Sequence, residues 1–309
     1  MRVLVVINPS AGMGMSAVFD FVRRVASAGH EVVIRYLVDD RTLTQLFEDV
    51  AQFDRAVVSG GDGTASGACY ELRDKQVPLL VFPSGTANLL ASNLNLPMEA
   101  SALAKLALSG PSALFDVGEL EASAPDERRL YSGFALMAGA GYDAQIMRGA
   151  APMKSTLGAA AYLVAALASP APSISQLVLE LDDRTVVTEG FAVLVTNFGR
   201  IQFDLPITPG ADPADGLLEI AVASGRSAAG LIPAVAAAVL DRAGEFRDRG
   251  PGVSVYSARS VTVTADPPLP VQWDGEVAEA HTPLTVRVLP SAVRLIVPVG
   301  SPFLQKERG

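Results

Sequence analysis

Apolar residues in the first third of the chain gather in short continuous runs that are separated by segments of helical spacing. Continuous runs of this kind are typical of strands buried on both faces of a sheet. They predict strands over residues 3–7, 32–38, 56–59 and 79–82. The intervening segments predict helices over residues 16–28, 65–72 and 87–94. Strands that alternate with helices favour a parallel sheet flanked by helices.

From about residue 118 the pattern changes to short strand-like runs divided by turn residues. These runs cover residues 114–120, 131–138, 177–181, 185–196, 217–223, 260–265 and 284–290. Two alanine-rich segments, 155–167 and 227–246, are predicted to be helices. Many short strands with turns between them indicate an antiparallel sandwich or barrel. We therefore predict an α/β domain followed by a β-rich domain.

Composition and charge narrow the classes of protein that the chain can represent. Half of its 309 residues are apolar and 18% are charged, which is enough apolar material for folded domains. The 24 Lys and Arg residues against 33 Asp and Glu residues give a net charge of −9, which argues against a nucleic-acid binder. The one cysteine, Cys69, excludes a disulfide framework and fits a reducing compartment.

No segment of the sequence has the length that a membrane-spanning helix requires. The longest apolar segments, 157–168 and 228–240, fall short of the roughly 20 apolar residues that cross a bilayer. The N-terminal run ends at Asn8-Pro9, and no signal-peptide cleavage pattern follows it. We therefore expect a cytoplasmic protein.

Three glycine-rich loops follow the predicted strands of the first domain. Glycine lets backbone N–H groups approach an anion, and a helix that starts after the loop adds partial positive charge. Each loop taken alone is equally well explained as an ordinary turn between a strand and a helix. Three in succession favour a phosphate site, and a carboxylate inside the second loop suits Mg²⁺ beside phosphate. The predicted binding residues are Asn8, Pro9, Gly12, Gly60, Gly61, Asp62, Gly63, Thr64, Ser84, Gly85, Thr86 and Asn88.

These loops and several later blocks resemble the diacylglycerol kinase catalytic-domain family, which includes bacterial lipid kinases and is related to sphingosine and ceramide kinases. The glycine-aspartate turn alone is shared with NAD kinases and phosphofructokinases, whereas the ordered set of blocks is more specific. The later blocks are Phe115-Asp116-Val117-Gly118, Lys154 with Gly158 and Tyr162, Pro209-Gly210-Ala211, Asp215-Gly216-Leu217-Leu218 and Asp274-Gly275-Glu276.

The resemblance implies a fold like that of diacylglycerol kinases and NAD kinases. In that fold an α/β nucleotide-binding domain, a parallel sheet with flanking helices, precedes a β-rich antiparallel sandwich-like domain that binds lipid. We expect the first domain to span residues 1–118 and to be completed by the tail 294–309. The second domain then spans residues 119–293, and the active site is implied to lie in the cleft.

The activity that the resemblance implies is transfer of the ATP γ-phosphate to the hydroxyl of diacylglycerol or a similar lipid alcohol, which yields phosphatidate or an analogous phospholipid. The implied cofactors are ATP and Mg²⁺. Catalytic Mg²⁺ is assigned to Asp62 and Asp116, and proton acceptance to Asp274 or Glu276, with the choice left open. A separate structural Mg²⁺ is assigned to Asp212, Asp215 and the carbonyl of Leu217.

One departure from the family pattern concerns the metal. Many members carry an Asp after the residue equivalent to Asn88, and this chain has Leu89 there. Two alternatives stay open: a non-catalytic lipid- or nucleotide-binding protein of the same fold, and a soluble-substrate kinase of the NAD kinase type. The expected partner is a lipid alcohol at a membrane surface, where the protein acts peripherally, and exposed edges of a β-rich domain are compatible with a homodimer.

Overall fold

A computed structural model describes residues 1–11, 15–141, 174–201, 205–208, 210–224, 252–274 and 276–304. The chain divides into two units: an α/β unit, Met1–Val117 with Leu289–Gly309, and a β-rich unit, Gly118–Val288. Strands β5 (Ser112–Ser123) and β16 (Glu276–Ile296) contribute residues to both units. The predicted fold class, an α/β domain followed by a β-rich antiparallel domain, is confirmed.

The α/β unit is built on a parallel sheet in the order β2, β1, β3, β4. These strands are β1 (Arg2–Ile7), β2 (Glu31–Tyr36), β3 (Arg55–Gly60) and β4 (Leu79–Pro83). The end of β16 runs parallel to β4, with Leu295 beside Leu79. Both faces of β1, β3 and β4 are buried, which explains why their sequences are continuous apolar runs.

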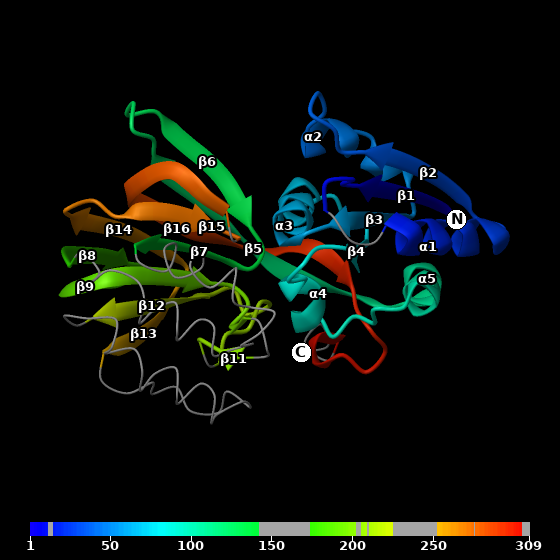
Figure 1. Ribbon diagram of the computed structural model, residues 1–309. Helices are drawn as coiled ribbons and strands as arrows, with labels where there is room; N and C mark the ends of the chain where they lie inside the picture. The colour runs from blue at the N-terminus through cyan, green and yellow to red at the C-terminus, as the bar shows by residue number, and fades with distance from the viewer. Residues whose placement is uncertain are drawn as a thin grey trace, which may run out of the picture. The chain divides into compact units, whose positions relative to one another are not determined.

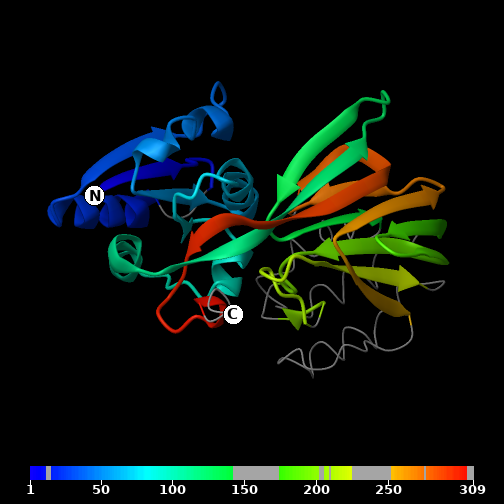
Figure 2. The ribbon, with the colours of Figure 1, turned by 180° about the vertical axis from the view of Figure 1, so that it is seen from behind.

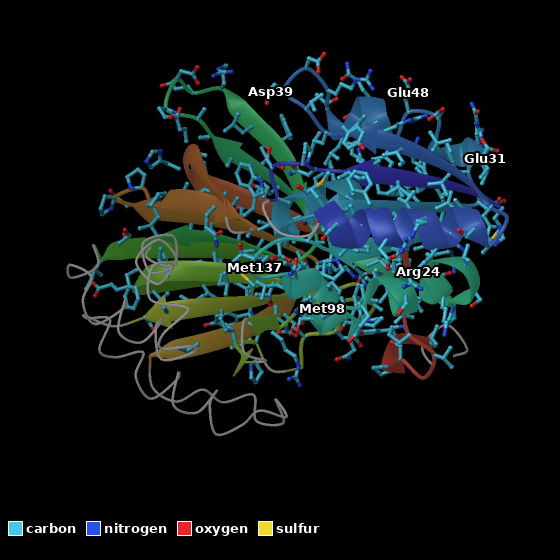
Figure 3. The ribbon with its side chains drawn as sticks, turned by 45° about the vertical axis from the view of Figure 1, so that its right-hand side comes forward. Arg24, Glu31, Asp39, Glu48, Met98 and Met137 are labelled. Carbon is cyan, nitrogen blue, oxygen red and sulfur yellow. The ribbon has the colours of Figure 1, made fainter. Side chains whose placement is uncertain are left out.

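Helices cover the parallel sheet. They are α1 (Met15–Ser27), α2 (Leu43–Leu46), η1 (Val50–Gln52), α3 (Asp62–Glu71), α4 (Leu89–Asn93) and α5 (Ala100–Ser109). Helix α1 buries Val18, Phe21 and Val25 at helical spacing, and it lies beside α5 below the sheet in Figure 1. Arg24, near the end of α1 on the side of α5 (Figure 3), is half-exposed, as expected for a charged residue on an amphipathic surface helix. The sequence pattern did not predict α2 or α5.

The β-rich unit consists of antiparallel ladders. Besides β5 and β16 it contains β6 (Arg129–Phe134), β7 (Met137–Gly141), β8 (Ser175–Leu181), β9 (Thr185–Thr196), β10 (Arg200–Ile201), β11 (Leu205–Pro206), β12 (Leu218–Ser224), β13 (Val253–Ala258), β14 (Ser260–Asp266) and β15 (Pro270–Trp273). Strand β9 pairs with β8 over residues 185–190 and with β7 over residues 192–196. Strand β16 pairs with β15 over its first residues and with β14 further along.

These two long strands therefore join the ladders into a sandwich, whose strands lie side by side in Figures 1 and 2. Apolar side chains from β7, β8, β9, β12, β14, β15 and β16 form one buried core inside it. The run predicted as one strand over 131–138 is two strands, β6 and β7, which are separated by Ala135 and Leu136. Strands β10, β11, β13 and β15 were not predicted. The predicted helices 155–167 and 227–246 lie outside the described residues.

In the described part of the chain, no helix combines the length and apolarity that crossing a bilayer demands.

The Arg35–Asp49 ion pair predicts an acid-sensitive contribution to stability. Arg35 donates to both carboxylate oxygens of Asp49, at 2.6 and 2.9 Å, and this lowers the pKa of that carboxyl below its usual value. The contribution is complete above the unfolded-state pKa of about 3.9 and is lost as pH falls through the lowered folded-state pKa. We expect Asp49→Asn to reduce the free energy of unfolding by about 1 kcal/mol at pH 7.

Urea unfolding between pH 7 and pH 3 checks this prediction, because the difference from wild type should shrink only below about pH 4. The control is Asp183→Asn, since Asp183 is exposed and its nearest arginine nitrogen is 4.0 Å away. A difference that stays the same at every pH would contradict the assignment.

A second prediction follows from close packing in the β5–β6 ladder. Gly118 faces Phe134 there, and a Cβ atom on Gly118 would lie 2.1 Å from Cζ of the Phe134 ring, which is fully buried. Gly118→Ala should therefore lower the free energy of unfolding by about 1–3 kcal/mol in urea denaturation. The added change Phe134→Leu should recover part of this loss, and two independent, additive losses would refute the steric explanation.

Candidate functional site

The first predicted loop begins at Asn8, directly after β1. Its backbone N–H donates to the carbonyl of Ser59 at 2.8 Å, and its side-chain Nδ2 donates to Oγ1 of Thr64 at 2.8 Å. The Asn8 Oδ1 accepts the N–H of Ser10 at 3.0 Å. One asparagine thus holds the first loop against the end of β3 and the first turn of α3. Pro9 is exposed beside it, and Gly12 lies outside the described residues.

The second and third loops approach each other closely. The hydroxyls of Ser59 and Ser84, at the ends of β3 and β4, are buried and lie 2.9 Å apart. A Cβ atom on Gly85 would lie 2.5 Å from the Cα of Gly61, so no side chain fits at position 85 without a backbone shift. Gly61 caps α3, whose first turn contains Asp62, Gly63 and Thr64.

Asn88 fixes the third loop from within. Its Oδ1 accepts the N–H of Gly85 and its Nδ2 donates to the carbonyl of Gly85, both at 2.8 Å. Asn88 itself has a left-handed backbone, with φ of +50°, which asparagine tolerates better than most residues. The N–H of Leu90, in α4, donates to Oδ1 of Asp62 at 3.1 Å and so ties the third loop to the second.

The predicted phosphate residues that the structure describes therefore form one connected group at the carboxyl ends of β1, β3 and β4. Ligands of open α/β sheets bind at this edge. Glycine backbone at the start of α3 leaves room for an anion near a helix N-terminus, and the hydroxyl of Thr86 is exposed beside it. The group has the chemistry of a phosphate cradle.

Asp62 and Asp116 differ in their surroundings. Asp62 is partly exposed in the first turn of α3, and its oxygen donors suit a hard cation such as Mg²⁺. Asp116 lies on β5 with 2% of its surface exposed, and its Oδ1 accepts the N–H of Ser291 on β16 at 2.6 Å. Asp116 therefore joins β5 to β16 whatever further role it has.

Asp212, Asp215 and Leu217 occupy one turn before β12 in the β-rich unit. Oδ1 of Asp212 accepts the N–H of Ala214 at 3.2 Å, and Oδ1 of Asp215 accepts the N–H of Leu217 at 2.9 Å. Carboxylate and carbonyl oxygens are the ligand type that a hard cation prefers. In the described ranges no three acidic, histidine or cysteine side chains gather as a metal-binding group.

Asp274 and Glu276 follow β15 and begin β16. Asp274 is 8% exposed and has a φ of +46°. Its carboxylate accepts the backbone N–H groups of Ala135, Leu136 and Met137. The backbone of Glu276 pairs with Trp273 in the β15–β16 ladder.

Sequence reasoning missed several residues that organise these sites. Ser59 was predicted only as the end of a strand, although its hydroxyl contacts Ser84. Asn197 was not singled out, yet its Nδ2 donates to the carbonyl of Ala135 at 2.9 Å. An Asn directly after the apolar run of β9 was a local signal, but its partner is 62 residues away in the sequence.

Two family models match the chain in succession. The model described as the diacylglycerol kinase catalytic domain matches residues 2–120. The model described as the YegS C-terminal NAD kinase beta sandwich-like domain matches residues 137–297, which is more than half of the chain. The matched regions lie in the same order as the α/β and β-rich units.

Known proteins share this arrangement. The chain is 27% identical over 308 residues to a diacylglycerol kinase from Mycobacterium tuberculosis, covering 96% of this chain and 95% of that protein. It is also 27% identical over 256 residues to an uncharacterized protein from Synechocystis, covering 79% of this chain but only 54%, about half, of that protein. The fold is similar to the crystal structure of a diacylglycerol kinase from Bacillus anthracis, with a TM-score of 0.71, 22% identity and 97% and 98% of the two chains covered. The chain therefore belongs to the family of the YegS C-terminal domain, whose model matches more than half of it, and this domain follows a region that matches the diacylglycerol kinase catalytic domain.

Proposed function

We propose that the chain transfers the γ-phosphate of ATP to the hydroxyl of diacylglycerol or a similar lipid alcohol at a membrane surface. The observation that carries this proposal is the group of three connected loops at the carboxyl ends of β1, β3 and β4. Asn8 donates to Thr64 and Asp62 accepts the N–H of Leu90, which ties the loops to one another, while Asn88 accepts the N–H of Gly85 within the third loop. A phosphate cradle in a chain of the lipid kinase family supports a phosphoryl donor in the α/β unit.

In this reaction the lipid hydroxyl oxygen forms a bond to the γ-phosphorus while the bond from that phosphorus to the bridging oxygen breaks, and ADP leaves. The hydroxyl proton passes to a carboxylate, either Asp274 or Glu276. Backbone N–H groups of the glycine loops bind the phosphates and orient the γ-phosphate for attack. Asp62, with Asp116 through water, would hold Mg²⁺, which neutralises phosphate charge when bound.

The direct test is a transfer assay with purified protein, labelled ATP, Mg²⁺ and diacylglycerol in mixed micelles. The expected result is label in the organic phase, in a product that migrates with phosphatidate. Label that stays in the aqueous phase on NAD would favour the soluble-substrate alternative. ATP binding without transfer to any lipid of a broad panel would favour the non-catalytic alternative.

The variant Asp62→Asn tests the role of the Asp62 charge in the same transfer assay. The asparagine Oδ1 can still accept the N–H of Leu90, so the substitution removes the charge while it keeps the tie between the loops. We expect the rate to fall by about 10- to 100-fold, as when a group that orients a metal is lost. Asp39→Asn is the matched control, because Asp39 lies in the exposed loop after β2 (Figure 3). An equal loss in both variants would contradict a specific role for Asp62.

Gly85→Ala tests the cradle itself. Its Cβ atom would meet the Cα of Gly61 and force the two loops apart, whereas a Cβ atom on Gly61 would have no neighbour closer than 3.9 Å. We expect this strain to cost about 1.4 kcal/mol or more in the nucleotide-bound state, so that ATP binding weakens by about 10-fold or more. Titration calorimetry with a non-hydrolysable ATP analogue should show a larger effect for Gly85→Ala than for Gly61→Ala. The reverse order would argue against phosphate binding between these loops.

A further inference from the structure

Helices α1 and α5 enclose an open groove on the surface of the α/β unit. Its volume is about 650 Å³, which is within the size range of ligand-binding clefts. Figure 3 shows these helices side by side, with Arg24 between them. The side chains that line the groove include Arg23, Arg24 and Ser27 of α1 and Ser101, Lys105 and Leu108 of α5. Cations therefore stand on both sides of the groove.

The charge at this groove is opposite to that of the chain as a whole. Helices α1 and α5, with the N-cap residue of α5, carry three cations against two carboxylates, whereas the whole chain carries 24 cations against 33 carboxylates. These groups are Arg23, Arg24, Lys105, Asp20 and Glu99. Asp20 is shared by Arg23 and Arg24, and one carboxylate cannot neutralise two guanidinium groups. An anionic partner is therefore attracted locally to a protein that repels it elsewhere.

Large apolar side chains are exposed on the same two elements. Met15 and Phe19 on α1 are 37% and 44% exposed, and Met98, directly before the N-cap residue of α5, is 61% exposed. Phe19 and Arg23 are four residues apart, so the ring and the guanidinium lie on one side of the helix. Cations beside an exposed phenylalanine are typical of helices that bind the membrane interface. A soluble anion would engage the cations alone and would leave these apolar side chains in water.

The first helix also lies close to the phosphate loops. It begins at Met15, shortly after the loop that starts at Asn8, and its 13 residues extend for about 20 Å. A bilayer in contact with α1 would therefore lie within about 20 Å of the loops.

We propose that the face formed by α1 and α5 docks on an anionic lipid bilayer, with lipid phosphates bound by Arg23, Arg24 and Lys105 and the Phe19 ring in the interfacial region. We call this surface the α1–α5 face. The proposal rests on the proposed function, because a lipid substrate requires the chain to reach a membrane. Vesicle binding is measured without ATP, so it is tested separately from transfer.

The test is flotation of the full chain with vesicles of phosphatidylcholine alone or of phosphatidylcholine mixed with phosphatidylglycerol. Wild type should bind the mixed vesicles, and this binding should weaken as salt is added. The double variant Arg23→Gln/Lys105→Gln should lower the partition coefficient by about 5-fold for each cation removed. Asp20 keeps its bond to Arg24 in this variant. Phe19→Ser should lower the partition coefficient by about 3- to 10-fold.

Matched controls lie on the β-rich unit. Arg128→Gln/Arg184→Gln also removes two cations, and Arg128 resembles Arg23 in being 75% exposed and bonded to an aspartate. Tyr131→Ser matches Phe19→Ser, because Tyr131 is an aromatic residue that is 66% exposed on β6. Both controls should bind vesicles like wild type, and thermal unfolding should give every variant the wild-type Tm.

A wild-type chain that floats with neither kind of vesicle would overturn the proposal, as would equal losses in the α1–α5 variants and their controls. Titration calorimetry with inorganic phosphate identifies a soluble occupant. Heat that the double variant loses, in a chain that does not bind vesicles, would assign the groove to a soluble anion instead. Vesicle binding without transfer to any lipid would refute the proposed function and leave the docking face standing, whereas transfer in neutral detergent micelles without vesicle binding would refute the docking face alone.

Discussion

Backbone N–H groups that have no ladder partner where strands end must find other acceptors when they are buried. Side chains of Asp and Asn supply these acceptors in both units. Asn88 bonds the peptide groups of Gly85 in the third loop, and Asp62 accepts the N–H of Leu90 at the start of α4. Asp274 accepts three N–H groups where β6 connects to β7. The side chains that are candidates for binding and catalysis, such as Asp62 and Asp274, therefore also hold the loops in which they lie.

This way of holding a carboxylate has an electrostatic consequence. On the surface of the α/β unit, Asp20 binds Arg24 and Asp49 binds Arg35, and in such pairs the arginine cancels the carboxylate charge. Backbone amides position a carboxylate through dipoles that carry no net charge. Asp62, which accepts the N–H of Leu90, and Asp274, which accepts three N–H groups, are bonded in this second way. The chain's net charge of −9 thus includes acidic groups in two different electrostatic settings.

Most of the fold could be predicted because its signals are local. The continuous apolar runs of β1, β3 and β4 follow directly from burial on both faces of a parallel sheet. Helix α5 was missed because its alanine-rich sequence carries a weak amphipathic pattern beside long apolar runs. The break between β6 and β7 at Ala135 and Leu136 was missed because the apolar run continues through it. The carboxylate of Asp274, 138 residues from Leu136 in the sequence, accepts the N–H of Leu136 there. The sequence shows which residue types are available at a site. The hydrogen bonds that these residues make depend on contacts between distant parts of the sequence, which only the folded chain forms.

Position 89 contributes to the charge of the site but not to the hydrogen bond that ties the second and third loops together. The chain has leucine where many family members carry aspartate, yet the neighbouring N–H of Leu90 still reaches Asp62. The tie between the second and third loops is made by backbone, so it does not depend on the side chain at position 89. Leu89 thus adds no negative charge at this edge, while the bond between Leu90 and Asp62 is still made. Because affinity for a hard cation rises with the charge of its ligands, a metal at this edge would rely more on the nucleotide phosphates than in members with the aspartate.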